Sequence, residues 1–133
     1  MPASSDALPA GPKQSRPRPD VPIVTVSHKE AAAEAVLETL RRELPAIVSK
    51  ALACPEEPYD GELRPGDINL RFLPALPLQE SLDCVIEIRT RWTHSRGENL
   101  QSRSDEIRDA LDRLGLERFG VWIGLSHAAW SQA

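Results

Sequence analysis

The stretch PIVTVSHKEAAAEAVLETLRRELPAIVSKAL, residues 22–52, decides the fold. Its opening segment, residues 22–26, is short and rich in β-branched side chains, which is typical of a buried strand. From Val36 to Ala51 apolar residues recur at spacings of three and four, which predicts an amphipathic helix running to about Leu52. The sequence therefore predicts a strand that leads straight into a helix packed on a sheet.

Two local signals shape this helix. Ser27 and Glu30 form the S-x-x-E pattern of a capping box, in which each side chain bonds a backbone N–H that the first helical turn leaves unpaired. We therefore expect the helix to begin directly after Ser27. Pro45 lies inside the helix and cannot donate to the carbonyl of Arg41, so we expect a kink there and not two separate helices.

After the first helix, the chain adds a second strand and then repeats the order of strand, helix and strand. Proline and glycine crowd the connection after the first helix, which predicts an irregular loop. Apolar and polar residues then alternate in three short segments, and a second amphipathic helix ends before a glycine that can adopt the left-handed conformation. The predicted segments are a loop at 54–66, strands at 67–72, 84–91 and 119–125, a helix at 99–114 and its cap at Gly115.

This order predicts an α/β (α+β) fold made of a duplicated β-α-β unit, with a four-stranded sheet and two helices on one face. The other sheet face would carry many charged side chains and would be either solvated or an interface. A ferredoxin-like domain has the same element order, but there the second and third strands form an antiparallel hairpin. The residues expected on the open face are Asn69, Arg71, Glu87, Arg89 and Arg91.

Composition bounds the domain and its partners. We expect a disordered Pro-rich tail at 1–21, one domain at 22–126 and a short tail at 127–133. The net charge is -4, so the chain lacks the excess of positive charge that is typical of a nucleic-acid-binding domain. Apolar runs are too short for a membrane span, and no signal peptide opens the chain. We therefore expect a cytoplasmic protein without nucleic-acid or membrane partners.

Reactive side chains are scattered. Cys54 and Cys84 stand 30 residues apart without a further ligand at metal-binding spacing, so neither a metal site nor a disulfide is indicated. The three histidines, His28, His94 and His127, are scattered, and no Ser or Cys at a strand-to-helix elbow is available to pair with one of them as a nucleophile. The sequence has no glycine-rich phosphate loop either, so we expect no metal and no cofactor.

Three segments resemble the tautomerase superfamily, the family of 4-oxalocrotonate tautomerase, macrophage migration inhibitory factor and 5-carboxymethyl-2-hydroxymuconate isomerase. They are the Pro22-led strand followed by a helix, the strand at 67–72 after a Pro-rich loop, and the strand at 84–91 followed by the Arg-containing turn 93–103. Together they span roughly residues 22–125. The resemblance implies a homo-oligomer, typically a trimer, in which the open sheet face becomes an interface.

The resemblance also implies a cofactor-independent keto-enol tautomerase or isomerase of a small enolisable carboxylate. Family members use an N-terminal proline whose amine has a lowered pKa to move a proton on the carbon beside a carbonyl. Arginines hold the carboxylate and stabilise the enolate. The matching residues are Pro22 and Arg96 as catalytic residues, with Arg64 and Arg71 as substrate-binding residues.

Pro22 departs from the family pattern because it is internal in this sequence, and an amide nitrogen cannot act as a base. A chain that begins at Pro22 would restore the amine, and Val21 stands where a GTG start codon would be read as Met. The alternative function is a non-catalytic oligomeric or partner-binding module, of the same fold or a ferredoxin-like one, in which the tail stays attached.

Overall fold

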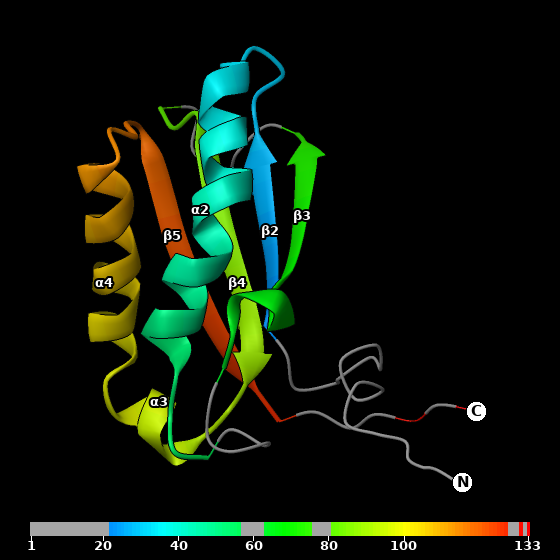
Figure 1. The fold of residues 1–133 in the computed structure, drawn as a ribbon, viewed down its shortest axis with the longest axis vertical. Helices are drawn as coiled ribbons and strands as arrows, with labels where there is room; N and C mark the ends of the chain where they lie inside the picture. The colour runs from blue at the N-terminus through cyan, green and yellow to red at the C-terminus, as the bar shows by residue number, and fades with distance from the viewer. Residues whose placement is uncertain (1–21, 57–62, 76–80, 128–130, 132) are drawn as a thin grey trace, which may run out of the picture.

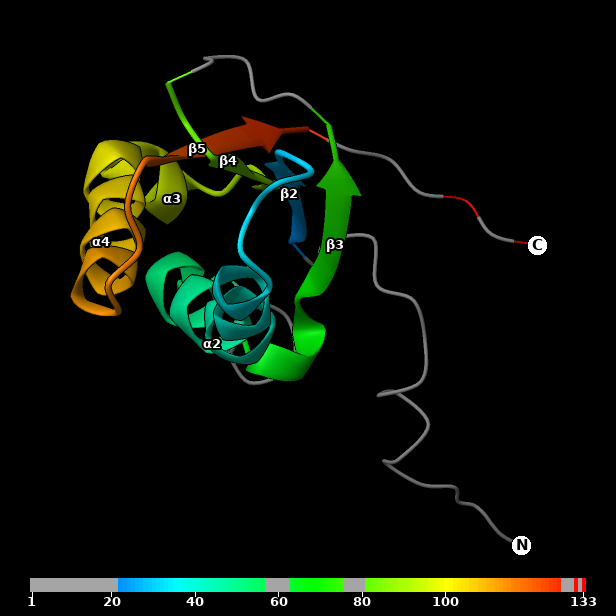
Figure 2. The ribbon, with the colours of Figure 1, turned by 90° about the horizontal axis from the view of Figure 1, so that it is seen from above.

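The computed structural model describes residues 22–56, 63–75 and 81–127, together with 131 and 133. The expected N-terminal tail and most of the expected C-terminal tail lie outside these residues. Four strands form one sheet, and the two long helices lie against the same face of it (Figures 1 and 2). The elements are β2 (Ile23–His28), α2 (Glu34–Leu52), the 3-10 helix η1 (Pro65–Asp67), β3 (Asn69–Pro74), β4 (Cys84–Arg91), α3 (His94–Glu98), α4 (Leu100–Arg113) and β5 (Phe119–Ser126).

The strand order in the sheet is β3-β2-β4-β5. β2 pairs in parallel with β3, and β4 pairs in parallel with β5. The two units meet where β2 pairs antiparallel with β4. The duplicated β-α-β unit is therefore confirmed. A ferredoxin-like fold is excluded because β2 separates the second strand of the sequence, β3, from the third, β4.

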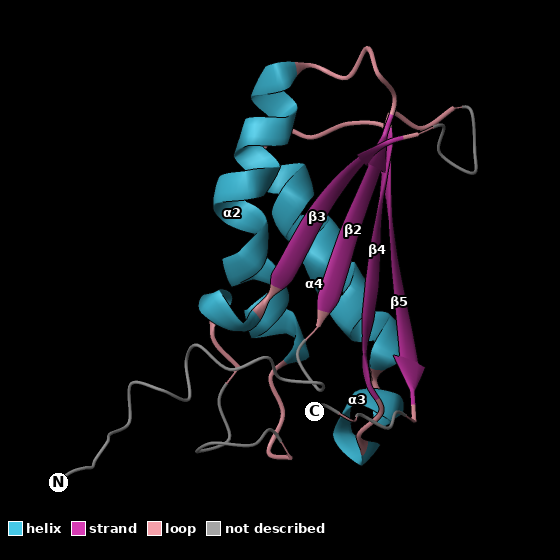
Figure 3. Ribbon diagram, turned by 90° about the vertical axis from the view of Figure 1, so that its right-hand side faces the viewer, coloured by secondary structure: helices cyan, strands magenta, loops and turns pink. Residues whose placement is uncertain are grey.

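The core lies between the sheet and the two long helices, which stand together on one side of the sheet (Figure 3). Alternate residues of β2 and β4 point into it, as the period of two along a strand requires. Full burial of each such aliphatic side chain stabilises the fold by roughly 1.5–3 kcal/mol. Among the described residues, the aliphatic side chains with no exposed surface are Val24, Val26, Leu40, Leu44, Val48, Leu52, Ile86, Ile88, Ile107 and Leu111.

The predicted start of the first helix is wrong. α2 begins at Glu34, its N-cap residue is Ala33, and no side chain caps it. Ser27 lies inside β2, where it is paired with Leu73 on one side and Val85 on the other. A residue in a central strand has backbone partners on both sides, and this pairing outweighs the single side-chain bond that a capping box would add.

As predicted, α2 continues through Pro45 as one helix and is not split into two. Smaller differences concern the ends of other elements. β3 begins at Asn69, two residues later than predicted, because the preceding residues form η1. The turn after β4 contains the short helix α3, which the sequence pattern did not indicate. The glycine cap is confirmed: Gly115 has φ 91°, and the N–H of Leu116 reaches back to the carbonyl of Leu111 at 3.2 Å.

None of the described helices covers the second face of the sheet (Figure 2). Trp122 is 48% exposed there, and the guanidinium of Arg89 lies 5.3 Å from the centre of its ring. Arg89 also pairs with Glu87 at 2.8 Å. We call this surface the open face.

Among the described helices, none combines the length and the apolar character needed to cross a membrane.

Candidate functional site

Pro22 occupies a buried position directly before β2. Its carbonyl accepts a hydrogen bond from the N–H of Asn69 at 3.0 Å, which fixes the head of β2 against the head of β3. The N and C=O of one strand residue point to the same neighbouring strand, so the Pro22 nitrogen faces β3 and the segment before it. Continuing the antiparallel register from Ile23 and Arg89 by one residue brings Pro22 opposite Thr90.

Arg64 lies in the segment that the Pro22 nitrogen faces. It precedes η1, where its N–H donates to Oδ2 of Asp67 and its carbonyl accepts from the N–H of Asp67, both at 2.9 Å. η1 leads within two residues to Asn69, the partner of Pro22. The predicted pair of Pro22 and Arg64 thus comes from two segments that meet at one end of the sheet, and Arg64 is exposed there.

Arg71 lies elsewhere. It pairs in register with Thr25, and the alternation of β3 directs it to the open face, where it is exposed. Pro22 has the same parity in β2 as Val24, so its ring is on the helix-covered face. Within one chain, Arg71 and the Pro22 ring are therefore on opposite faces of the sheet.

Arg96 lies at the same end of the molecule as Pro22 but is completely buried. Its Nε donates to the carbonyl of Leu52 and its Nη1 to the carbonyl of Arg91, each at 3.0 Å. Leu52 is the last residue of α2, so Arg96 neutralises the partial negative charge of that helix end and joins it to β4. These two hydrogen bonds give Arg96 a helix-capping role besides any role toward a substrate.

Arg103 on α4 supports the same helix end, and the sequence analysis missed it. Its Nη1 donates to the carbonyls of Ala51 at 3.1 Å and Ala53 at 2.9 Å. One signal could have indicated this role. No glycine follows Leu52, so the last carbonyls of α2 need donors from other parts of the chain.

Two buried polar side chains lie at and just after the end of β4, and sequence reasoning did not find them; the extended register brings one of them, Thr90, opposite Pro22. Thr90 is 5% exposed, and its Oγ1 has no hydrogen-bond partner. Thr93 is also buried; its Oγ1 lies 3.5 Å from Sγ of Cys54 and accepts from the N–H of Arg96 at 3.2 Å. The signal for Thr90 is visible in the sequence, since it follows Ile86 and Ile88 on the core-facing side of its strand.

Glu56 places an anion near this end of the molecule. Its carboxylate accepts from the N–H and from the hydroxyl of Ser95, both at 3.1 Å. The pKa of Glu56 is lowered: desolvation acts to raise it, but the hydrogen bonds from Ser95, from the backbone of Glu56 itself and from Cys54 together outweigh that effect. The carbonyl of Glu56 also accepts from Nη2 of Arg91 at 3.1 Å, so this residue connects the chain after α2 to both β4 and α3.

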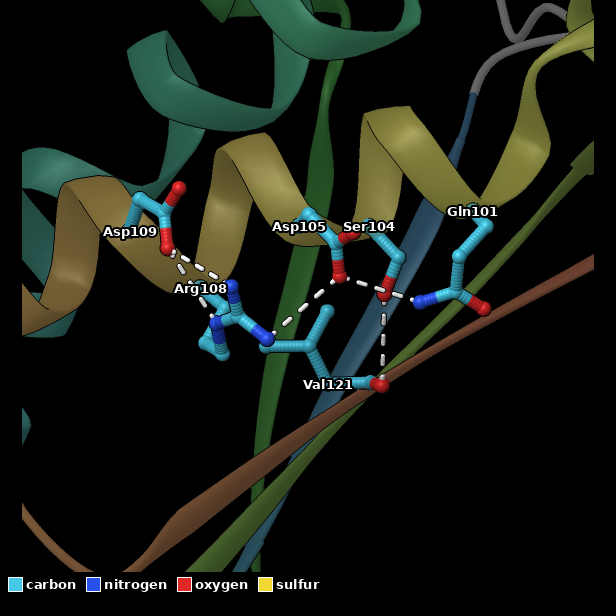
Figure 4. Close-up of polar contacts among 6 residues, drawn as sticks. All are labelled: Gln101, Ser104, Asp105, Arg108, Asp109 and Val121. Carbon is cyan, nitrogen blue, oxygen red and sulfur yellow. Dashed lines mark hydrogen bonds and ion pairs between the residues drawn. The ribbon is translucent and has the colours of Figure 1, made fainter.

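A second polar cluster lies on α4 (Figure 4). Arg108 contacts Asp109 at 2.9 Å and Asp105 at 3.5 Å, and Gln101 donates to Asp105. These side chains are exposed and satisfy one another, which is the usual state of a solvated helix face. In the part of the chain that the structure describes, no three acidic, histidine or cysteine side chains gather in a way that could hold a metal ion.

No family model and no curated protein matches the chain in sequence. Solved structures match it in shape. MIF2 of Leishmania major is 13% identical, with 84% of this chain and 94% of that chain covered and a TM-score of 0.52. Native Ps01740 is 12% identical, with 84% and 99% covered and the same TM-score of 0.52.

A 5-carboxymethyl-2-hydroxymuconate delta-isomerase is a weaker match, 12% identical, with 86% and 87% covered and a TM-score of 0.42. The fold of this chain is similar to that of MIF2. At these identities the likeness establishes the fold alone.

Proposed function

We propose that this chain, in a form that begins at Pro22, is a cofactor-independent keto-enol tautomerase or isomerase of a small enolisable carboxylate. The observation that carries the proposal is the buried position of Pro22 at the head of a central strand in a tautomerase-superfamily fold. Burial and nearby cations both disfavour a protonated amine. A free Pro22 amine would thus be available near neutral pH to accept and return a proton.

The arginines take different parts in this proposal. Arg64 is exposed beside the site and can hold the substrate carboxylate through its fork of donors. Arg96 is held by two carbonyls, so its permanent charge would act mainly by lowering the pKa of the Pro22 amine. Arg71 lies on the open face, so a substrate-binding role for it requires a neighbouring copy of the chain.

We propose a homo-oligomer, specifically a trimer, assembled through the open face. This surface carries Trp122 and the 51% exposed Leu73, and a groove of about 520 Å³ runs along β4 and β5 beside Val85. Exposed aromatic and aliphatic side chains on an otherwise charged surface favour an interface. Light scattering on the purified protein would give the mass, and Trp122→Lys should shift the assembly to a monomer. A monomeric parent protein would contradict the proposal.

The alternative is a non-catalytic binding module, and it is favoured by the amide nitrogen that Pro22 has in the full sequence. The test compares three proteins in the ketonisation of phenylenolpyruvate: full-length protein, protein beginning at Pro22, and the latter with Pro22→Ala. All buried core residues lie between Val24 and Ile123, so the shorter protein keeps the whole described core. Thermal melts would establish that each protein is folded.

Activity limited to the Pro22-initiated protein would support the tautomerase. Its loss in Pro22→Ala would identify the amine as the base. If all three proteins are folded and inactive, the tautomerase proposal is wrong and the binding module stands. Intact mass of the protein from its native source would then give the start residue, and the presence of residues 1–21 would contradict a start at Pro22.

A further inference from the structure

Thr90 is a buried threonine whose hydroxyl has no hydrogen-bond partner among the described residues. Across the described residues, its Oγ1 is the buried side-chain polar atom without a hydrogen-bond partner. Leaving a buried hydroxyl unpaired destabilises a protein, and valine would fill the same space without that penalty. The neighbours of Thr90 on the same side of β4 are Ile88, Ile86 and Cys84, so packing gives no reason for a hydroxyl here.

Thr90 lies where the proposed chemistry would occur. Pro22 directs its carbonyl to Asn69 in β3, so the Pro22 and Thr90 pair belongs to the type that exchanges no backbone hydrogen bonds. Side chains are closest in such pairs, with Cβ atoms about 4.5–5.5 Å apart. Both residues have the parity that faces the helices. The hydroxyl is therefore a direct neighbour of the proline ring.

The other polar groups at this place are already engaged. The hydroxyl of Thr93 accepts from the N–H of Arg96, and two nitrogens of the Arg96 side chain donate to the carbonyls of Leu52 and Arg91. The hydroxyl of Thr90 still has both its donor and its acceptor capacity. It can therefore bind an oxygen of a ligand without breaking a contact within the fold.

We infer that Thr90 is a substrate-binding residue, whose hydroxyl donates a hydrogen bond to a carboxylate or enol oxygen of the substrate held against Pro22. This inference rests on the proposed tautomerase function. In ketonisation, Pro22 accepts the proton of the enol hydroxyl and delivers a proton to the adjacent carbon, so no net proton is gained or lost. Thr90 keeps its own proton throughout and fixes the oxygen near the amine.

The experiment uses the Pro22-initiated protein with three substitutions. Thr90→Val removes the hydroxyl and keeps the shape, and Thr90→Ser keeps the hydroxyl. Thr25→Val makes the same chemical change on β2, where Thr25 pairs with Glu87 on the open face. Steady-state kinetics with phenylenolpyruvate and a thermal melt are measured for each protein.

We expect Thr90→Val to lower kcat/KM by about tenfold to a hundredfold, the usual effect of one lost hydrogen bond to a charged group. The loss should lie mainly in KM, and the melting temperature should stay equal or rise. Thr90→Ser should recover most of the activity. Thr25→Val should match the parent protein in kcat, KM and melting temperature.

Two results overturn the inference and leave the tautomerase intact. One is an active parent whose KM and kcat are unchanged in Thr90→Val. The other is a loss of activity that Thr90→Ser does not recover and that accompanies a lower melting temperature, since this indicates a packing role. Inactivity of the folded parent protein overturns the proposed function, and the inference with it.

Discussion

The two faces of the sheet come from the same strands but differ in what they keep from water. In β4, Ile86 and Ile88 point to the helix-covered face and have no exposed surface. Arg89, which follows Ile88 in the same strand, points to the open face and is exposed. The helix-covered face is occupied by apolar side chains along most of its length. The contrast teaches that burial sets the sequence on one face, and the other face is available for binding.

The largest effect should separate two aliphatic residues of β4. Ile88→Ala on the helix-covered face should lower the free energy of unfolding by about 2–5 kcal/mol, because it leaves a cavity in the core. Val85→Ala on the open face should cost less than about 1 kcal/mol when the protein is dilute enough to be monomeric, since Val85 is only half-buried within one chain. Denaturant unfolding monitored by circular dichroism gives both values.

A larger, concentration-dependent loss in Val85→Ala at higher protein concentration would support the proposed trimer. It would mean that the open face is covered by another copy, because the stability of an oligomer depends on protomer concentration. Equal small losses in both variants would contradict the core described above.

The next effect separates two arginines. Arg96→Met should destabilise the fold by about 2–3 kcal/mol, because it leaves the carbonyls of Leu52 and Arg91 without their donor. Arg89→Met should change stability by less than about 1 kcal/mol, because its pair with Glu87 is on the surface. Thermal denaturation at low and high salt measures both, and only the Arg89 variant should lose its difference from the parent as salt rises.

The elements of the fold differ in how well the sequence predicts them. The alternation in β4 and the spacing in α2 predict strands, helix and burial, since both patterns are local. The capping box at Ser27 is local too, but it is overruled by pairing of β2 with two other strands. This pairing joins Ser27 to strands that are distant in sequence, so the residues next to Ser27 give no sign of it.

The candidate site divides in the same way. Pro22 and Arg64 are predicted residues that belong to segments meeting at one end of the sheet. The distinct placement of Arg71 follows from parity, which the alternation of β3 already indicates. The missing glycine after Leu52 indicates that the end of α2 needs donors, but their identity as Arg96 and Arg103 could not be predicted, because the contacts join residues 44 and more positions apart in the chain.

A smaller effect concerns the buried thiol at the start of β4. Burial, and then the charge of Asp83, raise the pKa of Cys84 to about 11, above the ordinary value of about 8.5 for a thiol. The raised pKa contributes stability that is fully present below about pH 8.5. This contribution is lost as the pH rises toward 11, since only the unfolded chain then gives up the proton.

We expect a fall of at most about 1.4 kcal/mol in the free energy of unfolding per pH unit between about pH 9 and 11 from this group. Urea unfolding at several pH values measures the slope. Cys84→Ala should have a shallower slope than the parent, whatever its stability at neutral pH. Equal slopes in the two proteins would show that the thiol is not held in its neutral form.

The smallest effect tests the start of α2. Ala33 has the extended conformation of an N-cap residue, φ -65° and ψ 133°, but its methyl group cannot accept a hydrogen bond. Ala33→Ser should therefore stabilise the protein by about 1 kcal/mol by accepting from an unpaired N–H of the first turn. Ser27→Ala should change stability by less than about 0.5 kcal/mol, since Ser27 is a strand residue that caps no helix. Thermal melts of both variants suffice. A loss near 1 kcal/mol in Ser27→Ala with no gain in Ala33→Ser would return the helix start to the capping box, and with it would shorten β2 at the end opposite Pro22.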